Sequence, residues 1–201
     1  MSTLAIALAL AGAAAPAQST DAVLRSYAAC AVKRDDAVMM AMLDAWDENG
    51  YRTAARNFSE NARCIVSDEA ATAVTVSVFN QDRGKLRGIV AETLVKRSNT
   101  ARRLAPVPRA PAYSAPWFAL TSRVTAIDEM AVCVAAIDPA GVLALLSTQP
   151  GSAAQKQAFG ALTPSLGTCL AKGYQLDTKP AALRAALAEA LYHRDRAEAV
   201  K

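Results

Sequence analysis

Apolar residues recur at helical spacing through the first half of the chain. Between Thr20 and Lys33 they lie three and four positions apart, at Val23, Leu24, Tyr27, Ala28, Ala31 and Val32. This spacing predicts an amphipathic helix. Asp35 and Asp36 can cap a second helix, which we expect to end near Asn49-Gly50 because glycine commonly terminates helices. Further helices are expected at Tyr51–Val66 and Gly84–Arg97.

The second half of the chain shows the same order of elements. Helices are expected at Val124–Ile137, Asp138–Leu146, Ser152–Ala171 and Pro180–Ala199. A short stretch typical of extended structure precedes the last helix of each half, at Val74–Val78 and at Tyr174–Leu176. These two stretches could pair as one short β-ribbon, although two strands alone are only marginally stable. The predicted fold class is therefore mainly α, with two quasi-repeated units of about four helices each.

A proline-rich segment separates the two halves. Residues 104–117 contain prolines at positions 106, 108, 111 and 116. Proline lacks the backbone N–H that a helix needs and clashes with the preceding turn, so neither flanking helix continues through this segment. We therefore expect a first helical unit at 18–103, a linker at 104–117 and a second helical unit at 118–201.

Sequence similarity between the two halves indicates an internal duplication. When Cys30 is aligned with Cys133, Ala28 falls over Ala131 and Asp35 over Asp138. Later in each half, residues 86–94 align with residues 183–191, and five of the nine positions are identical. The identical positions include an arginine and a glutamate from each half, which are Arg87, Glu92, Arg184 and Glu189. Ordinary ion pairing between helices would explain them, and a paired polar contact between the two halves is the more specific hypothesis.

The four cysteines form an even set, which favours disulfides in an exported protein. Of the three pairings that Cys30, Cys64, Cys133 and Cys169 allow, the duplication selects Cys30 with Cys64 and Cys133 with Cys169. No two cysteines have metal-ligand spacing, and the single histidine, His193, is far from all four in sequence. No nucleotide-binding or zinc signature occurs, so we expect neither a metal site nor a cofactor.

The amino-terminal segment is typical of an export signal. An apolar, alanine-rich run from Leu4 to Ala15 is followed by Ala15-Pro16-Ala17, the small-x-small pattern that signal peptidase cleaves. We expect a signal peptide at 1–17 and a periplasmic or secreted product. Because no lysine or arginine precedes the run, an amino-terminal helix of the folded protein is the alternative. Charges or prolines interrupt every later apolar segment, so no transmembrane anchor is expected.

Composition and charge restrict the classes of partner. Hydrophobic residues make up 53% of the 201 residues, which is enough to form a core, and the net charge of +4 permits an anionic partner without requiring one. The candidates for anion contact form a basic stretch without an intervening acid: Lys96, Arg97, Arg102, Arg103 and Arg109. A solvated linker would also explain them. No aromatic residue lies among them, so there is no specific nucleic-acid signal.

An acidic cluster before Gly50 suggests a calcium loop at first sight. In that register, Ala45 and Arg56 would occupy the first and twelfth positions, where carboxylates are required. We therefore interpret the cluster, which comprises Asp44, Asp47, Glu48 and Asn49, as an acidic helix end that is closed by Gly50.

The tail Ala188-Glu189-Ala190-Leu191-Tyr192, preceded by Ala182-Leu183-Arg184, resembles small exported proteins of unknown function from alphaproteobacterial genomes. The resemblance is best over Asp128–Arg194 and weaker in the first half. It implies export and a helical fold, and it supplies no activity.

Spacing alone brings no set of titratable residues together as a catalytic site, so we favour a non-catalytic function. The leading hypothesis is a binding or structural module of the cell envelope, whose partner is an envelope protein or an anionic envelope component. The alternative is a hydrolase that acts on an envelope polymer through Glu92 and Glu189. A third hypothesis is a chaperone-like groove lined by Met39, Met40 and Met42, although such methionines more often fill a core.

Overall fold

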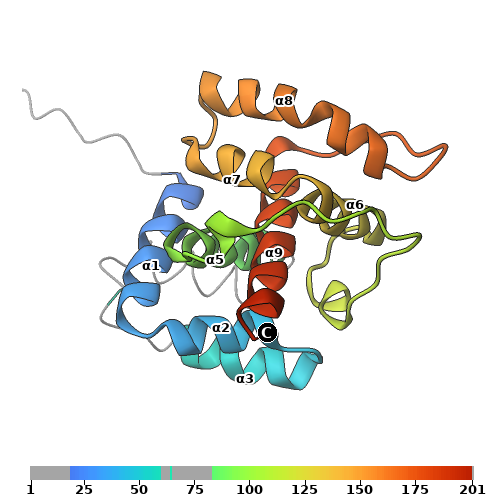
Figure 1. Ribbon diagram of the computed structural model, residues 1–201. Coiled ribbons are helices and arrows are strands. Elements are labelled where there is room, and N and C mark those ends of the chain that lie inside the picture. Colours follow the sequence, from blue (N-terminus) through green and yellow to red (C-terminus); the bar gives the residue numbers. More distant parts are fainter. Residues whose placement is uncertain (1–18, 60–63, 65–82, 201) are drawn as a thin grey trace, which may run out of the picture.

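The computed structural model describes residues 19–59, 64 and 83–200, and helices dominate these ranges (Figure 1). The helices are α1 Thr20–Arg34, α2 Asp36–Asp44, α3 Glu48–Ser59, α5 Arg83–Arg97, α6 Thr125–Ile137, α7 Pro139–Ser147, α8 Ala153–Cys169 and α9 Pro180–Ala199. Two short 3-10 turns, η2 Ala101–Arg103 and η3 Pro116–Leu120, flank most of the proline-rich segment. The prediction of a mainly α fold is confirmed.

Side-chain caps explain where several of these helices begin. The Asp35 carboxylate accepts a hydrogen bond from the Val38 N–H at the start of α2, and Asp138 accepts one from the Gly141 N–H at the start of α7. Such caps satisfy N–H groups that have no partner within the helix. The two capping aspartates are the ones that the sequence alignment placed in register.

Helix α2 ends earlier than the sequence predicted. It stops at Asp44, and Asn49-Gly50 lies in the first turn of α3 instead of closing α2. Asp47 causes the difference, because its side chain accepts a hydrogen bond of 2.7 Å from the Gly50 N–H and so caps the start of α3. Asp47 and Glu48 therefore mark the beginning of α3, where negative charge is favourable. Asp44 does end α2, but the interpretation of Gly50 as the residue that closes this helix end is wrong.

Some of the predicted elements lie outside the described residues, namely the signal peptide at 1–17 and the extended stretch Val74–Val78. Tyr174–Leu176 lies within the described chain, in the segment between α8 and α9, where it is neither helix nor strand, so it does not form part of a β-ribbon. The backbone hydrogen bonds recorded around it are local ones, from the Tyr174 N–H to the Ala171 carbonyl and from the Asp177 N–H to the Gln175 carbonyl. No β-strand occurs in the described ranges.

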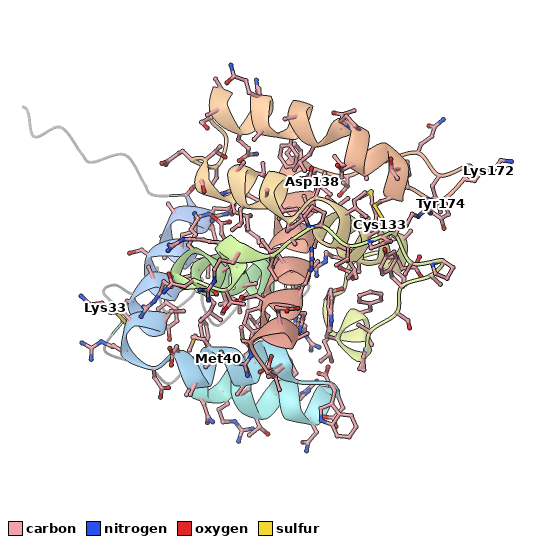
Figure 2. All side chains as sticks on the ribbon, viewed as in Figure 1. Lys33, Met40, Cys133, Asp138, Lys172 and Tyr174 are labelled. Carbon is pink, nitrogen blue, oxygen red and sulfur yellow. A yellow bond between two sulfur atoms is a disulfide. The ribbon has the colours of Figure 1, made fainter. Side chains whose placement is uncertain are left out.

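Two disulfides connect the helices in the predicted pairing. Cys30 on α1 is bonded to Cys64, with 5.7 Å between the Cα atoms, and Cys133 on α6 is bonded to Cys169 at the end of α8, with 5.6 Å between them. The Cys133 disulfide is visible as a yellow bond in Figure 2. The two disulfides join residues that are 34 and 36 positions apart in the sequence. In the loop-entropy model, a disulfide that closes a loop of this size stabilises the folded state by roughly 3 to 4 kcal/mol.

Helices α5 and α9 form the centre of the molecule and make the most extensive contact between helices in the described chain (Figure 1). Every residue from Leu183 to Tyr192 on α9 is buried, and α1 and α6 pack on the central pair. The core also contains Met39 and Met42, which are fully buried, so these methionines do not line a groove. Helices α5 and α9 approach closely at Gly88, where an added Cβ atom would lie 2.3 Å from the Ala185 Cβ.

Within the described part of the chain, no single helix is both long and apolar enough to cross a membrane. Only α6 and α7 taken together pass that test of length and composition, and they are bent by 106° relative to each other.

The close approach at Gly88 gives the first testable expectation. Gly88→Ala should lower the free energy of unfolding by about 1 to 3 kcal/mol, because the new methyl group overlaps the Ala185 backbone and forces α5 from α9. Gly167→Ala on α8 is the matched control. A Cβ there meets nothing within 4 Å, so higher helix propensity should stabilise the protein by up to about 1 kcal/mol. Urea unfolding measures the stability of both variants. Equal changes in the free energy of unfolding for Gly88→Ala and Gly167→Ala would contradict the close contact between α5 and α9.

Candidate functional site

Two reciprocal ion pairs join the central helices. Arg87 on α5 donates a hydrogen bond of 2.6 Å from Nε to Glu189 on α9. Arg184 on α9 donates from Nε and Nη2 to the two oxygens of Glu92 on α5, at 2.9 and 2.8 Å. All four side chains are buried. The hypothesis of a paired polar contact between the two halves is confirmed.

Each of these arginines also binds the carboxyl end of a short helix. Arg87 donates to two carbonyl oxygens at the end of α2, and Arg184 donates to two at the end of α7. The acceptors are Met42, Leu43, Leu145 and Leu146, at distances of 2.7 to 2.9 Å. The last carbonyls of a helix have no partner within the helix and carry partial negative charge. A buried guanidinium satisfies both needs at once, so the two arginines hold α2 and α7 against the central pair.

The surroundings of Glu189 are closed and electrically neutral. Its second oxygen accepts a hydrogen bond of 2.5 Å from Arg123, whose Nε donates to Asp128 at 2.6 Å. We call Arg87, Arg123, Asp128 and Glu189 the closed cluster. Its two positive and two negative charges balance, and no side chain in it is more than 7% exposed. The closed cluster thus satisfies its own charges, although Arg123 also lines a smaller pocket of about 310 Å³.

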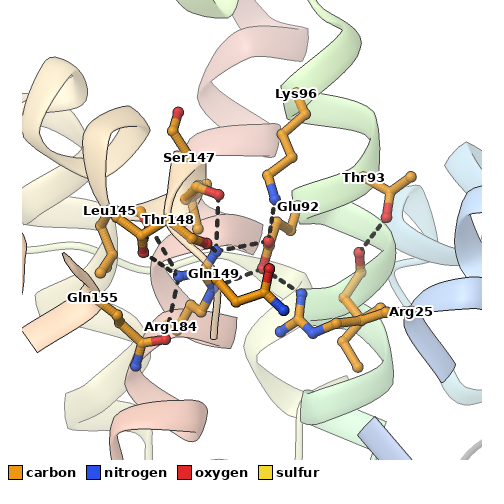
Figure 3. A network of polar contacts seen from close by, with 12 residues as sticks. Arg25, Glu92, Thr93, Lys96, Leu145, Ser147, Thr148, Gln149, Gln155 and Arg184 are labelled. Carbon is orange, nitrogen blue, oxygen red and sulfur yellow. Dashed lines mark hydrogen bonds and ion pairs between the residues drawn. The ribbon is translucent and has the colours of Figure 1, made fainter. Parts of the chain in front are cut away.

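The surroundings of Glu92 are open and positively charged. Besides Arg184, Glu92 accepts a hydrogen bond of 2.9 Å from Arg25 on α1 and one of 2.6 Å from Lys96 on α5 (Figure 3). We call Arg25, Glu92, Lys96 and Arg184 the open cluster. Its three cations face one carboxylate, and the side chains of Arg25 and Lys96 are 27% and 44% exposed. The open cluster therefore presents a surplus of positive charge to solvent.

This surplus lies in a pocket of about 540 Å³ between α1, α5 and the turn that follows α7. We call it the basic pocket. Its lining residues are Arg25, Ala29, Lys33, Glu92, Thr93, Lys96, Arg97, Ser147, Thr148, Gln149 and Pro150. Four of these carry positive charge and one carries negative charge. Lys33 points outward from the end of α1 (Figure 2), and the Arg25 Nε–H is buried without a hydrogen-bond partner among the described residues.

The positive surroundings keep both glutamates ionised. Burial raises the pKa of the Glu92 carboxyl, but the hydrogen bond from Arg184 and the charges of Arg25 and Lys96 outweigh burial and lower the pKa to about 2. Burial also raises the pKa of Glu189, and Arg87 and Arg123 more than offset it, so that the pKa lies below its ordinary value. Neither carboxyl group can donate a proton near neutral pH, as a general acid must.

The candidates for anion contact fall into two groups. Lys96 and Arg97 line the basic pocket, whereas Arg102, Arg103 and Arg109 do not. Arg102 donates hydrogen bonds to the Asn99 side chain and the Lys96 carbonyl. Arg103 and Arg109 are exposed residues of η2 and of the proline-rich segment.

Sequence spacing did not identify Arg25 and Lys33 as parts of a site. They lie on α1, more than sixty positions before Lys96 and Arg97, and only the packing of α1 on α5 brings the two pairs together. The one available signal was the alignment itself, in which Arg25 falls over Asp128 and so differs in charge between the halves.

His193 is remote from the basic pocket. Its ring stacks on Trp117 with 4.6 Å between centroids, and burial lowers its pKa to about 4, so it is neutral at physiological pH. Among the described residues, no group of three or more histidine, cysteine, aspartate or glutamate side chains could hold a metal ion.

Comparisons with protein-family models, curated proteins and solved structures found no match for this chain.

The ionised state of Glu92 makes stability depend on pH. A carboxyl group whose pKa is lower in the folded than in the unfolded state stabilises the fold above its unfolded pKa, here 4.5, and loses that contribution as pH falls toward 2. For Glu92 the contribution is about 3 kcal/mol. We therefore expect Glu92→Gln to be less stable than the wild type at pH 7, and the difference should narrow as pH falls from about 5 to about 2.

Guanidinium unfolding at a series of pH values measures this difference. Asp177→Asn, at an exposed position between α8 and α9, is the control and should show no narrowing, because it removes a carboxylate outside both clusters. A stability difference for Glu92→Gln that stays constant between pH 7 and pH 2 would contradict the assigned pKa.

Proposed function

We propose that the protein is a non-catalytic binding module of the cell envelope, and that it binds a phosphate-bearing envelope component in the basic pocket. The observation that carries this proposal is the difference between the two clusters. The closed cluster balances its charges in a buried place, whereas the open cluster has three cations for one carboxylate, and two of these cations, Arg25 and Lys96, line a pocket. Lys33 and Arg97 add two further cations to the lining.

The chemistry of the lining fits a phosphate group. Arginine and lysine are the usual ligands of phosphate oxygens, and arginine can donate from several nitrogens in one plane. Arg25 uses Nη1 for Glu92, and its Nε–H has no acceptor among the described residues. Gln149 also lines the pocket, and its side-chain amide can donate to an anion, whereas the hydroxyls of Ser147 and Thr148 donate to the carbonyls of Leu143 and Leu145.

We attribute the open cluster to divergence after a duplication. Matching contacts support a common origin of the two units: the aspartate caps, the disulfides and the reciprocal arginines that bind the ends of α2 and α7. The position of Arg25 in the first unit is held by Asp128 in the second. This one position accounts for much of the difference in charge between the open and the closed cluster. Arg25 adds a positive charge beside Glu92, whereas Asp128 adds a negative charge beside Arg123.

An envelope location is consistent with the two disulfides, because such bonds persist in oxidising compartments. The leader expected at 1–17 and the resemblance to small exported proteins point the same way. The hydrolase alternative lacks support from the geometry. Glu189 is completely buried and Glu92 is held by three cations, so neither carboxylate is available to act on a polymer.

Charge reversal at two exposed residues tests the basic pocket. Lys33→Glu combined with Arg97→Glu should weaken binding of tripolyphosphate at least tenfold, because two attractive charges in the lining become repulsive. Neither side chain belongs to the open cluster, so folding should be preserved. Isothermal titration calorimetry at 0.15 M salt measures the affinity under conditions that screen charges more than about 8 Å apart.

Arg103→Glu combined with Arg109→Glu is the matched control, because it changes the net charge equally outside the pocket. We expect it to change the affinity less than threefold. Equal losses in both double variants, or no binding of tripolyphosphate by the wild type, would contradict the proposed function. Flotation with phosphatidylglycerol vesicles then identifies the source of the phosphate: pocket-dependent flotation indicates a lipid headgroup, and soluble binding alone indicates a free or polymeric phosphate.

A further inference from the structure

A second pocket, of different character, lies beside the same turn after α7. It has a volume of about 450 Å³ and is formed by α8, the segment before α9 and the first turns of α9. We call it the apolar pocket. Its apolar lining consists of Phe159, Leu166, Leu176, Pro180 and Leu183. Small-molecule sites in proteins usually have volumes of about 300 to 1,000 Å³ and a mainly apolar lining with a few polar groups, and the apolar pocket meets both criteria.

Among the described residues, Lys156 supplies the only charge in the lining of this pocket. It is exposed, and no acidic residue lines the pocket with it. Gln155, the buried polar residue of the lining, already accepts a hydrogen bond of 2.9 Å from the Gly151 N–H. An apolar cavity with one cation at its wall is complementary to a molecule that has an aliphatic body and a single negative charge.

A glycine lies in the lining of the pocket. Gly160 on α8 lines it, and a Cβ atom added there would meet nothing within 4 Å. Alanine at this position would favour the helix, since glycine is less favourable than alanine within a helix by about 1 kcal/mol. The chain therefore has an unfavourable residue where a side chain would occupy the space of a ligand.

We propose that the apolar pocket binds an aliphatic monocarboxylate. The alkyl chain lies against Phe159, Leu166 and Leu183, and the carboxylate lies near the Lys156 ammonium group. This site differs from the basic pocket in its chemistry, because it provides one cation and a broad apolar wall where the basic pocket provides four cations. The proposal does not depend on phosphate binding.

Octanoate is the probe, and methyl NMR of the full chain locates its binding. We expect the methyl resonances of Leu166 and Leu183 to shift with a saturable dependence on octanoate concentration. Gly160→Phe should weaken this binding at least tenfold, because the ring fills the cavity, while the fold is retained. Gly167→Phe is the matched control, because it adds the same ring to α8 at a position where a Cβ also meets open space, outside the pocket. It should change the affinity less than twofold.

Replacing the charged Lys156 side chain distinguishes the contact with the ligand carboxylate from burial of the ligand's alkyl chain alone. Lys156→Met should weaken octanoate binding several-fold and leave binding of 1-octanol unchanged or stronger. The Lys33→Glu and Arg97→Glu double variant should bind octanoate as the wild type does, which separates this site from the basic pocket. The proposal is overturned if the Leu166 and Leu183 methyl groups do not respond, if Gly160→Phe and Gly167→Phe have equal effects, or if Lys156→Met weakens both probes alike.

Discussion

The reciprocal contact between Arg87 and Glu189 and between Arg184 and Glu92 governs how the helices pack. A buried charge that loses its partner destabilises a protein by about 3 to 5 kcal/mol, so each of these four residues constrains the register of α5 against α9. The arginines extend the constraint, because they also bind the last carbonyls of α2 and α7. A shift of either central helix would break the ion pairs and release two helix ends together.

The close approach at Gly88 makes this contact possible. Long arginine side chains reach across to glutamate and onward to helix ends only if the two backbones lie near each other, and Gly88 against Ala185 provides that proximity. Apolar residues such as Leu86, Leu187 and Leu191 surround the charges and exclude water. Electrostatic attraction is stronger in such surroundings, and the cost of an unpaired charge is higher as well.

The two ends of this contact have different consequences for function. Around Glu189, the added cation Arg123 is balanced by Asp128, which leaves a closed structure. At the Glu92 end, Arg184 alone would balance the charge of the carboxylate. Arg25 and Lys96 add two more positive charges, and both residues line the basic pocket. A charge that the fold does not require for its own pairing, and that lies at the wall of a cavity, is available to a ligand.

Local patterns predicted the helices well, because spacing of apolar residues and capping side chains act within a few positions. The disulfide pairing and the reciprocal ion pairs were also accessible, because residues such as Cys30 and Arg87 recur at matching places in the second half. The predicted end of α2 near Gly50 is wrong, because glycine alone does not fix a helix end and the Asp47 cap places Gly50 in the first turn of α3. Both pockets were missed, because each is lined by segments that meet only through tertiary packing.

Side-chain NMR of the arginines tests most directly whether the surplus charge of the open cluster binds a phosphate group. Each arginine gives a separate Nε–H resonance, which responds when an anion approaches the guanidinium group. On titration with tripolyphosphate at neutral pH, we expect the resonances of Arg25 and Arg97 to shift together, while that of Arg87, held in the closed cluster by Glu189, stays in place. Shifts confined to Arg102, Arg103 and Arg109, with Arg25 unchanged, would contradict a phosphate site in the basic pocket.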